Sequence, residues 1–328
     1  MEYKRFIPLF AFVVFCIAVY RLYYALSAYE CAKIVQAIFA IPPARLGLSA
    51  FLVAASYISL TLFDTLAIRY IGAKLPYRRI ALASFTALSI GHTIGLAAAS
   101  SGAVRYRFYS HWGIGAADIA KIILFCAMTV GLGLNTLMGL SLLLQVNVAA
   151  KLLGFSPTGA IALGATCLLL TALYVALAAV VRRPFTIKHW VVSMPSLELA
   201  LAQIFIGAIN VCFVAAALYE LLPPTAGIGY FAVTAVYVLA DVASIVSHVP
   251  GGLGVLEVVM VHFLPLESVI GALVIFRVIY FLVPFMIGVV LFAAYELMLR
   301  RRRKVSSHSF LFPQLRSGPF QRFDKGRK

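Results

Sequence analysis

The chain has 328 residues, of which 63% are hydrophobic and 12% are charged, and its formal net charge is +16. A mean hydropathy of +1.01 lies far above the values of soluble globular domains. Apolar runs near the ~20 residues that a helix needs to cross a bilayer recur along the chain. The composition therefore excludes a soluble protein and predicts an all-α polytopic membrane protein.

Eight apolar stretches follow one another along the chain. We predict six full spans, at residues 6–26, 46–71, 117–145, 158–181, 197–222 and 269–299. The first follows Lys4 and Arg5, as in a signal peptide, but its bulky end offers no small-residue cleavage site, so we expect a retained span. The remaining stretches, 81–99 and 229–264, are irregular because Gly, Ser, His or Pro interrupt them.

Loop charge distinguishes two topologies. If all eight stretches cross, seven basic residues fall in outer loops, against the positive-inside tendency. These are Lys33, Arg45, Arg105, Arg107, Arg182, Arg183 and Lys188. If the irregular stretches are re-entrant hairpins, only Lys33, Arg45 and Lys151 remain outside. The charge rule favours the second topology, with both termini cytoplasmic. One hairpin, at about 80–116, then enters from the cytoplasm, and the other, at about 229–266, enters from outside.

Each predicted hairpin contains a candidate helix break. Pro removes a backbone donor and Gly adds little helix stability, so both residues favour interruption. The residues concerned are Gly95 and Gly102 in SIGHTIGLAAASSGAVRYRFY, and Pro250, Gly251, Gly252 and Gly254 in SHVPGGLGVLE. Opposed broken hairpins are typical of transporters built from inverted repeats, with a site near the membrane midplane. The similarity between the two segments is short, and chance explains it as well as duplication does.

The first hairpin carries Arg105, Arg107 and Tyr109 beside its glycines. Arg binds phosphate through two parallel hydrogen bonds, so a lipid phosphate is a candidate ligand. Positive-inside anchoring of a loop is the alternative. In the second hairpin Glu257 lies one turn into the helix that restarts after the glycines, where it either caps that helix or serves function. The opposite charges suggest that Arg105 and Glu257 pair or face each other across a cavity.

Four further charged or aromatic residues lie within apolar sequence. Asp241 is expected either to pair with Arg277 or to line the cavity. Arg277 is too deep in its span to reach the interface, so we expect it to face inward, and Tyr280 three residues later shares its helical face. Asp64 lies five residues before Arg69, and we expect these two to pair near the interface.

The sequence carries no pattern of a catalytic or metal centre. It lacks a P-loop, GxSxG and HExxH. His92 and His248 are isolated, and we expect them to be packing or hydrogen-bonding residues. The cysteines form no CxxC pair, which predicts buried thiols and neither disulfides nor a metal site. They are Cys16, Cys31, Cys126, Cys167 and Cys212. We expect no cofactor, no metal and no enzymatic activity.

Positive charge concentrates at the C-terminus. From Arg300 onward there are ten Lys or Arg residues and one acid, Asp324. The run RRRRK after a span is typical of a cytoplasmic anchor on anionic lipids, at about 1 kcal/mol per charge near the surface. No folded basic domain accompanies it, so nucleic acid is not an expected partner. We divide the chain into a transmembrane domain, 1–299, and a disordered basic cytoplasmic tail, 300–328.

Four motifs resemble the transmembrane region of the lysylphosphatidylglycerol synthetase family, the membrane half of the bacterial multiple peptide resistance factor. They are PGGLGVLE, GHTIGLAAASSGAVRYRFYS, SLELALAQIFIGAINVCFVAAALYELLP and FRVIYFLVP, between Ala44 and Glu296. The resemblance implies a flippase-like fold in the bacterial inner membrane and makes Arg105 and Glu257 candidate site residues. The family's cytoplasmic synthase domain, which aminoacylates phosphatidylglycerol, has no counterpart here, so aminoacyl transfer is not expected.

Three functions follow as hypotheses. The favoured one is a flippase that moves an anionic or modified phospholipid, or another lipid of the cell envelope, between leaflets. The second is a nonenzymatic partner of a separately encoded lipid synthase. The third is an intramembrane lipid-modifying enzyme that uses Glu257 or Asp241 as an acid–base group. The expected partners are membrane lipids, with a separate synthase and a second copy of the chain as open alternatives.

Overall fold

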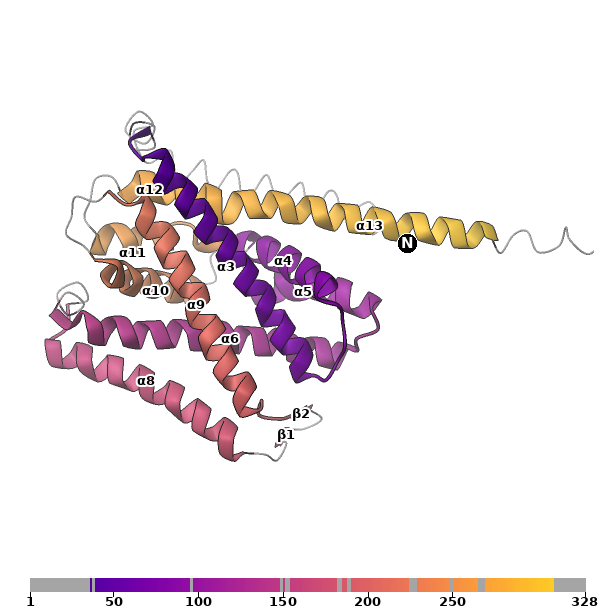
Figure 1. Cartoon of the computed structure of the whole chain (residues 1–328), viewed down its shortest axis with the longest axis horizontal. Coiled ribbons are helices and arrows are strands. Elements are labelled where there is room, and N and C mark those ends of the chain that lie inside the picture. Colours follow the sequence, from indigo (N-terminus) through magenta and orange to yellow (C-terminus); the bar gives the residue numbers. More distant parts are fainter. Residues whose placement is uncertain are drawn as a thin grey trace, which may run out of the picture.

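A computed structural model describes residues 36, 39–94, 97–147, 150, 154–181, 185–187, 190–223, 229–247, 250–264 and 269–309. Its long elements are α3 (Pro43–Tyr70), α4 (Tyr77–Ile94), α5 (Ala97–His111), α6 (Ala116–Leu144), α8 (Pro157–Val180), α9 (Leu197–Leu221), α10 (Tyr230–Ser247) and α13 (Val283–Ser309). The shorter ones are η2 (Pro250–Gly252), α11 (Val255–Phe263), α12 (Val269–Phe276), the π-helical turn η3 (Arg277–Leu282), and strands β1 (Phe185–Ile187) and β2 (Trp190–Val192). Figure 1 shows these elements as one helical bundle, with the short antiparallel strand pair between α8 and α9.

The predicted all-α polytopic membrane fold is confirmed. Six helical segments among the described residues are long and apolar enough to cross a membrane. Five of them, α3, α6, α8, α9 and the continuous α12–η3–α13, match predicted spans. The sixth is α10, which lies inside the second predicted hairpin. The predicted span at residues 6–26 lies outside the described residues.

The ends of the helices follow from local sequence. Ser156 and Ser196 precede α8 and α9, and each hydroxyl accepts a hydrogen bond from a backbone N–H of the first turn. This satisfies donors that a helix start leaves free. Pro at the start of α3 and of α8 needs no intrahelical donor, so it fits the first turn without cost.

Small residues bring the central helices close together. A Cβ atom added to Gly133 of α6 would lie 2.4 Å from the carbonyl carbon of Gly207 in α9, which leaves no space for any side chain. Such glycine contacts are a usual way to pack helices within lipid. Because lipid tails are as apolar as leucine, burial of apolar side chains does not drive association there, and close backbone packing contributes more. The core of the bundle is therefore built by close backbone approach as well as by apolar side chains.

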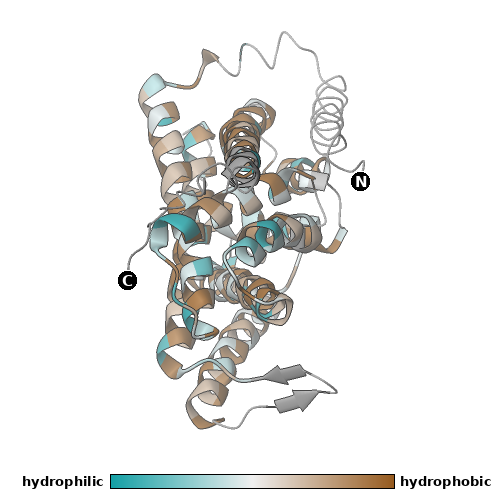
Figure 2. Ribbon diagram, turned by 90° about the vertical axis from the view of Figure 1, so that its right-hand side faces the viewer, coloured by the Kyte–Doolittle hydropathy of each residue, from teal (hydrophilic) through white to brown (hydrophobic). Residues whose placement is uncertain are grey.

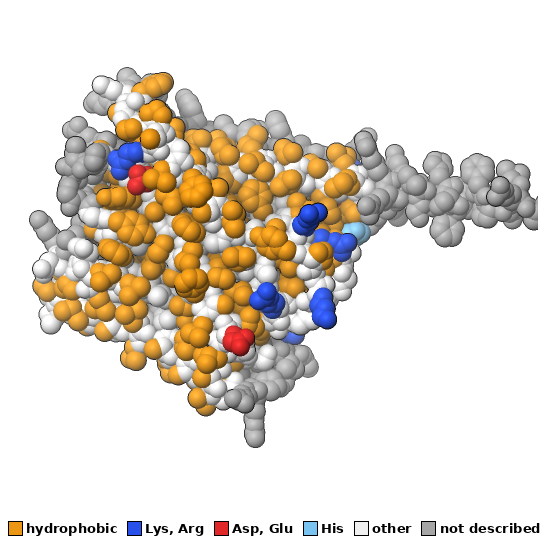
Figure 3. All heavy atoms as spheres, viewed as in Figure 1, with side chains coloured by type: hydrophobic (Ala, Val, Ile, Leu, Met, Phe, Trp, Pro, Cys, Tyr) orange, Lys and Arg blue, Asp and Glu red, His pale blue; other side chains and the backbone are white. Residues whose placement is uncertain are grey.

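The outside of the bundle is apolar. Brown, the colour of hydrophobic residues, dominates the helix ribbons in Figure 2, and many large hydrophobic side chains on these helices are exposed. On the face shown in Figure 3, hydrophobic side chains cover a broad central area, while several Lys and Arg side chains gather toward the right-hand end, near the connection from α3 to α4. An apolar belt with basic residues gathered toward one end is typical of proteins that span a bilayer.

Two helical hairpins enter the bundle from opposite ends. Helices α4 and α5 form one, and α10 with α11 forms the other, as the arrangement in Figure 1 shows. Their tips meet, because a Cβ atom added to Gly251 would lie 3.5 Å from the Thr93 carbonyl oxygen at the end of α4. The opposed hairpins predicted from loop charge are present. Because α10 has 18 residues, or about 27 Å, this limb of the second hairpin is close to a full span.

Two predictions about local structure are wrong. Gly102 does not break a helix but lies within α5, where a Cβ atom would come 3.0 Å from Ile123 Cδ1 of α6. Its role is close packing. The tail was predicted to be disordered from residue 300, whereas α13 continues as a helix through residues 300–309. Gly95 and residues 310–328 lie outside the described residues.

Candidate functional site

The proline–glycine segment between α10 and α11 is a true helix break. Pro250 opens the turn η2, and Gly251, Gly252 and Gly254 have φ angles of 60°, 58° and 84°. Side chains rarely tolerate this left-handed region, which explains why glycine occupies it. At Gly252 space adds a second restriction, since a Cβ atom would lie 2.6 Å from Ser244 Oγ. The predicted break is confirmed.

Arg277 of η3 binds the backbone carbonyls of this break, and we call the break closed while these contacts are made. Its Nη2 donates to the Gly252 carbonyl at 2.9 Å, and its Nη1 donates to the Gly251 carbonyl. Its Nε and Nη2 also donate to Glu257 Oε1 at 2.7 Å and Oε2 at 3.0 Å. The guanidinium lies 4.7 Å from the Phe281 ring centroid. The guanidinium therefore satisfies both carbonyls that the interrupted helix leaves free.

Glu257 makes two sets of contacts, and one of them is the helix cap considered from the sequence. Its Oε2 accepts a hydrogen bond from the Gly254 backbone N–H at 2.8 Å, which caps α11. The same carboxylate pairs with Arg277, whose side chain is 5% exposed while that of Glu257 is 20% exposed. Glu257 thus fixes both the start of α11 and the orientation of the guanidinium.

A cavity of about 350 Å³ lies where the hairpin tips meet. Its wall combines apolar side chains with a few polar ones from α4, α9, α10 and η3. The polar lining residues are His92, Asn210, Tyr237, Asp241, Ser244, Arg277 and Tyr280, joined by the backbone of Gly251 and Gly252. Arg277 and Tyr280 face this cavity together, as their spacing predicted.

Asp241 lines the cavity and does not pair with Arg277. No hydrogen bond or ion pair involves its carboxylate within the described part of the chain. His92 is similar, since its buried Nδ1 has no hydrogen-bond partner among the described residues. The His92 ring stacks on Tyr280 with centroids 6.2 Å apart. The cavity therefore contains polar groups whose hydrogen-bonding capacity is unused.

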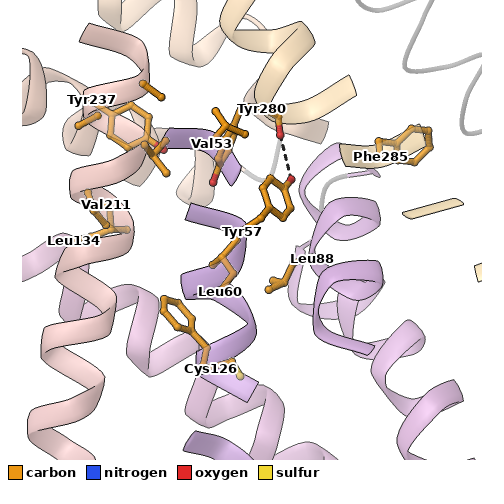
Figure 4. Packing of buried hydrophobic residues seen from close by; sticks show 14 of the residues in the cluster. Val53, Tyr57, Leu60, Leu88, Cys126, Leu134, Val211, Tyr237, Tyr280 and Phe285 are labelled. Carbon is orange, nitrogen blue, oxygen red and sulfur yellow. Dashed lines mark hydrogen bonds between the residues drawn. The ribbon is translucent and has the colours of Figure 1, made fainter. Parts of the chain in front are cut away.

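Asn210 and Tyr57 also support the site, and sequence reasoning missed both. The Asn210 amide donates to Ser56 and Ser59, which fixes α9 against α3 in the cavity wall. The Tyr57 hydroxyl donates to the Tyr280 carbonyl at 3.0 Å, as drawn in Figure 4. An amide within the apolar run of α9 is a signal that could have identified Asn210, because polar groups inside spans are rare and usually partnered.

Arg105 lies elsewhere, so it neither pairs with Glu257 nor faces it across the cavity, and both alternatives considered from the sequence are wrong. Its Nε and Nη2 each donate to one Asp64 carboxylate oxygen at 2.8 Å. The Tyr109 hydroxyl and Ser84 Oγ donate to the same carboxylate at 2.9 and 2.6 Å, and Cys126 Sγ lies 3.7 Å away. Arg105 is 2% exposed and Asp64 is fully buried. This cluster joins α3, α4, α5 and α6, and neither Arg105 nor Tyr109 reaches the cavity.

The predicted pairing of Asp64 with Arg69 is also wrong. Five residues of helix correspond to about one and two-fifths turns, so the two side chains point in different directions. Asp64 faces the core, whereas Arg69 is exposed at the end of α3. A buried carboxylate needs a cation within the bundle, and Arg105 from α5 supplies it.

Arg107 occupies a third position. Its Nη2 donates to Glu296 Oε2 at 2.8 Å and its Nε also contacts this carboxylate, which ties α5 to α13. The Arg107 side chain is 39% exposed, and it does not line the cavity. Near this end Arg79 lies 5.8 Å from the Trp112 ring centroid. Arg107 therefore anchors the rim of the bundle.

Among the described residues, no group of three or more His, Cys, Asp or Glu side chains is arranged to hold a metal ion. The described cysteines are free, with Cys126 and Cys167 buried and Cys212 half-buried. Cys16, Cys31 and His248 lie outside the described residues.

Comparisons with known proteins identify two bacterial relatives of this chain. No family model matches the chain. The chain is 33% identical over 253 residues to the uncharacterized protein slr0712 of Synechocystis sp., covering 76% of this chain and 79% of that protein. It is 30% identical over 258 residues to the inner membrane protein YbhN of Escherichia coli, covering 77% of this chain and 80% of YbhN. Neither name states a lysylphosphatidylglycerol synthetase family. The chain is a multi-pass inner-membrane protein and belongs to the family that includes YbhN.

Proposed function

We propose that this protein moves a phospholipid, or another lipid of the cell envelope, between the two leaflets. The observation that carries the proposal is the cavity at the meeting point of the two opposed hairpins, where Asp241, His92 and Arg277 interrupt an apolar wall. A charged headgroup cannot cross hydrocarbon without a large desolvation cost. A polar cavity deep in an otherwise apolar bundle lowers that cost. Both termini lie in the cytoplasm in this proposal.

The size of the cavity suits a headgroup. Its volume of about 350 Å³ is at the small end of the range for ligand sites, which is about 300–1,000 Å³. The space accommodates a polar headgroup, while the acyl chains stay in the surrounding lipid. The apolar face of the bundle that Figure 3 shows is compatible with acyl chains that slide along it.

Arg277 is the residue through which a phosphate would act. A phosphate accepts two parallel hydrogen bonds from a guanidinium, as the Glu257 carboxylate does now. An anionic headgroup in the cavity would therefore compete with Glu257 for Arg277. Because Arg277 also holds the carbonyls of Gly251 and Gly252, this exchange would loosen the break and the second hairpin with it. No chemical step on the lipid is part of this proposal.

Reconstitution into liposomes tests the proposal. The purified protein is reconstituted with a fluorescent phosphatidylglycerol analogue, and a membrane-impermeant quencher reports its movement between leaflets. We expect movement with the native chain and a roughly ten- to hundredfold slower rate for Arg277→Ala. This corresponds to loss of a charged hydrogen-bond pair worth about 1.5–3 kcal/mol. Arg277→Lys keeps the charge without the fork and should be intermediate.

A matched control comes from another arginine–carboxylate pair. Arg45 pairs with Glu220 at 3.1 Å, is about one-quarter exposed and does not line the cavity. Arg45→Ala should therefore retain native lipid movement. Equal rates for Arg277→Ala and the native protein, with both folded by gel filtration, would remove Arg277 from the site. No lipid movement by the native chain would argue against a flippase.

The two other hypotheses give different results in a deletion strain. Unchanged leaflet distribution with a missing lipid species would favour an intramembrane enzyme. A reduced amount of that species, restored when the synthase is overproduced, would favour a nonenzymatic partner of the synthase. A changed distribution with unchanged total composition is the outcome that the proposed function predicts.

A further inference from the structure

Asp241 is half-buried and differs from the other carboxylates of the bundle, the buried Asp64 and Glu296 and the half-buried Glu257. Asp64 and Glu257 each hold an arginine through two hydrogen bonds, and Glu296 holds Arg107. Asp241 lies twelve residues into α10, lines the cavity and has no hydrogen bond or ion pair among the described residues. An unpaired carboxylate at this depth is costly while it is charged. It therefore requires a ligand that neutralises it.

The described residues around Asp241 offer no free cation. From η3 Asp241 shares the cavity with Arg277 and Tyr280, from α4 with His92, and from α9 with Asn210, while Tyr237 and Ser244 come from its own helix. Arg277 is already neutralised by Glu257 of α11. The backbone carbonyls of the break, which could otherwise bind a metal cation, are occupied by the Arg277 guanidinium. Because no described residue of the cavity is left to neutralise Asp241, we assign this role to a proton from water.

We propose that Asp241 is a proton-binding site whose loading controls the contact between Arg277 and Glu257. With Asp241 protonated and neutral, Arg277 stays on Glu257 and the break stays closed. When Asp241 releases its proton, its carboxylate becomes a second acceptor for Arg277 within the same cavity. It then competes with Glu257 and loosens the second hairpin. The proton is taken from and returned to water that reaches the cavity, and no other bond changes.

This inference rests on the proposed lipid movement, to which it adds an energy source. If the cavity opens alternately to the two sides, one proton can enter Asp241 from one side and leave to the other in each cycle. The unpaired His92 Nδ1 in the same cavity is the competing proton site. An experiment must therefore separate Asp241 from His92.

Infrared difference spectroscopy tests proton binding without reference to transport. The native protein in lipid is stepped between acidic and alkaline buffer, and the C=O stretch of a protonated carboxyl group is recorded. We expect one such band from the native protein, its loss in Asp241→Asn, a shifted band in Asp241→Glu, and a retained band in His92→Gln. Absence of the band from the native protein, or its persistence in Asp241→Asn, would overturn the inference.

The liposome assay then tests coupling. An imposed pH gradient should accelerate movement of the phosphatidylglycerol analogue by the native chain severalfold and leave Asp241→Asn unaffected, with gel filtration confirming that the variant is folded. Equal stimulation of both proteins would exclude Asp241 as the coupling site. If no lipid moves under any condition, the proposed function fails, whereas the infrared result still decides whether Asp241 binds a proton.

Discussion

Two of the arginine–carboxylate pairs among the described residues, Arg105–Asp64 and Arg277–Glu257, have nearly the same local geometry and different surroundings. Two hydrogen bonds of 2.8 Å join Arg105 to Asp64, and two of 2.7 and 3.0 Å join Arg277 to Glu257. The first pair is sealed among four helices, with Tyr109 and Ser84 occupying the remaining acceptor positions. The second lies at a cavity and holds the carbonyls of a broken helix.

The difference shows that the chemistry of a pair does not define its role. A sealed, fully hydrogen-bonded pair has no position for a ligand, so its effect is to fix the helices that it joins. A pair at a cavity wall can exchange one partner for an incoming anion or for a second carboxylate. We therefore assign Arg105 to the framework and Arg277 to the site.

The largest effect should come from breaking the sealed pair. Arg105→Ala leaves the Asp64 charge buried without a partner, which costs about 3–5 kcal/mol. We expect loss of the monodisperse peak in gel filtration in detergent and a strongly lowered melting temperature. Arg277→Ala should lower it less, because Glu257 is one-fifth exposed and can reach water.

A double variant sharpens this prediction. Asp64→Leu combined with Arg105→Met removes both charges and should recover most of the stability, because apolar residues often replace a buried ion pair without loss. It should also retain lipid movement in liposomes. A stable double variant that no longer moves lipid would place Arg105 in the transport machinery and contradict the assignment.

A smaller loss of stability and of lipid movement should distinguish a glycine of the second hairpin from one of the first. Gly252→Ala introduces a side chain at a φ of 58° and places its Cβ atom 2.6 Å from Ser244 Oγ. The left-handed conformation alone costs roughly 1–2 kcal/mol. We expect a lower melting temperature and slower lipid movement. Gly102→Ala meets only the movable end of Ile123 and should stay near native in both measurements. Equal effects of the two variants would show that the break has no special role.

The rim pair should contribute least to stability. Because Glu296 is only 9% exposed, the test removes both charges: Arg107→Ala combined with Glu296→Gln deletes a pair whose arginine is 39% exposed, and such pairs are typically worth about 0–1 kcal/mol. The melting temperature and the transport rate should both stay close to native. A transport defect in this variant without a change in melting temperature would point to a headgroup contact at the rim.

Cysteine labelling should establish the orientation of the hairpins without perturbing them. Ser110 is exposed near the end of α5, and Phe155 is exposed before α8 at the other end of the bundle. In a background free of native cysteines, Ser110→Cys should react with an impermeant reagent only from the cytoplasm, and Phe155→Cys only from outside. The reverse pattern would invert the predicted topology.

Much of the architecture could be predicted from the sequence. Apolar length identified α3, α6, α8, α9 and the last long helix, because the bilayer fixes how many residues a span requires. Loop charge identified the two hairpins. The glycines after Pro250 identified the helix break, because backbone conformation is a local property of these residues. Spacing alone placed Arg277 and Tyr280 on one face.

The partners of the buried charges could not be predicted in the same way. Arg105 was matched to Glu257 by an analogy between hairpins, and Asp64 was matched to Arg69 by closeness in sequence, yet Asp64 and Arg105 lie 41 residues apart and pair with each other. Pairing between helices depends on the rotation of each helix about its axis and on its depth in the bundle. Both are set by packing against neighbours such as the Gly133–Gly207 contact.

The sequence by itself determined a multi-pass membrane protein, the positions of most helices and the break at Pro250. These depend on apolar length and on local backbone preference, which neighbouring residues carry. Only the tertiary structure decided that Arg277 closes the break, that Arg105 is sealed away from it, and that Asp241 lies in the cavity with no ion pair to any described residue. These features depend on which side chains four or more helices bring together, and no single segment contains that information.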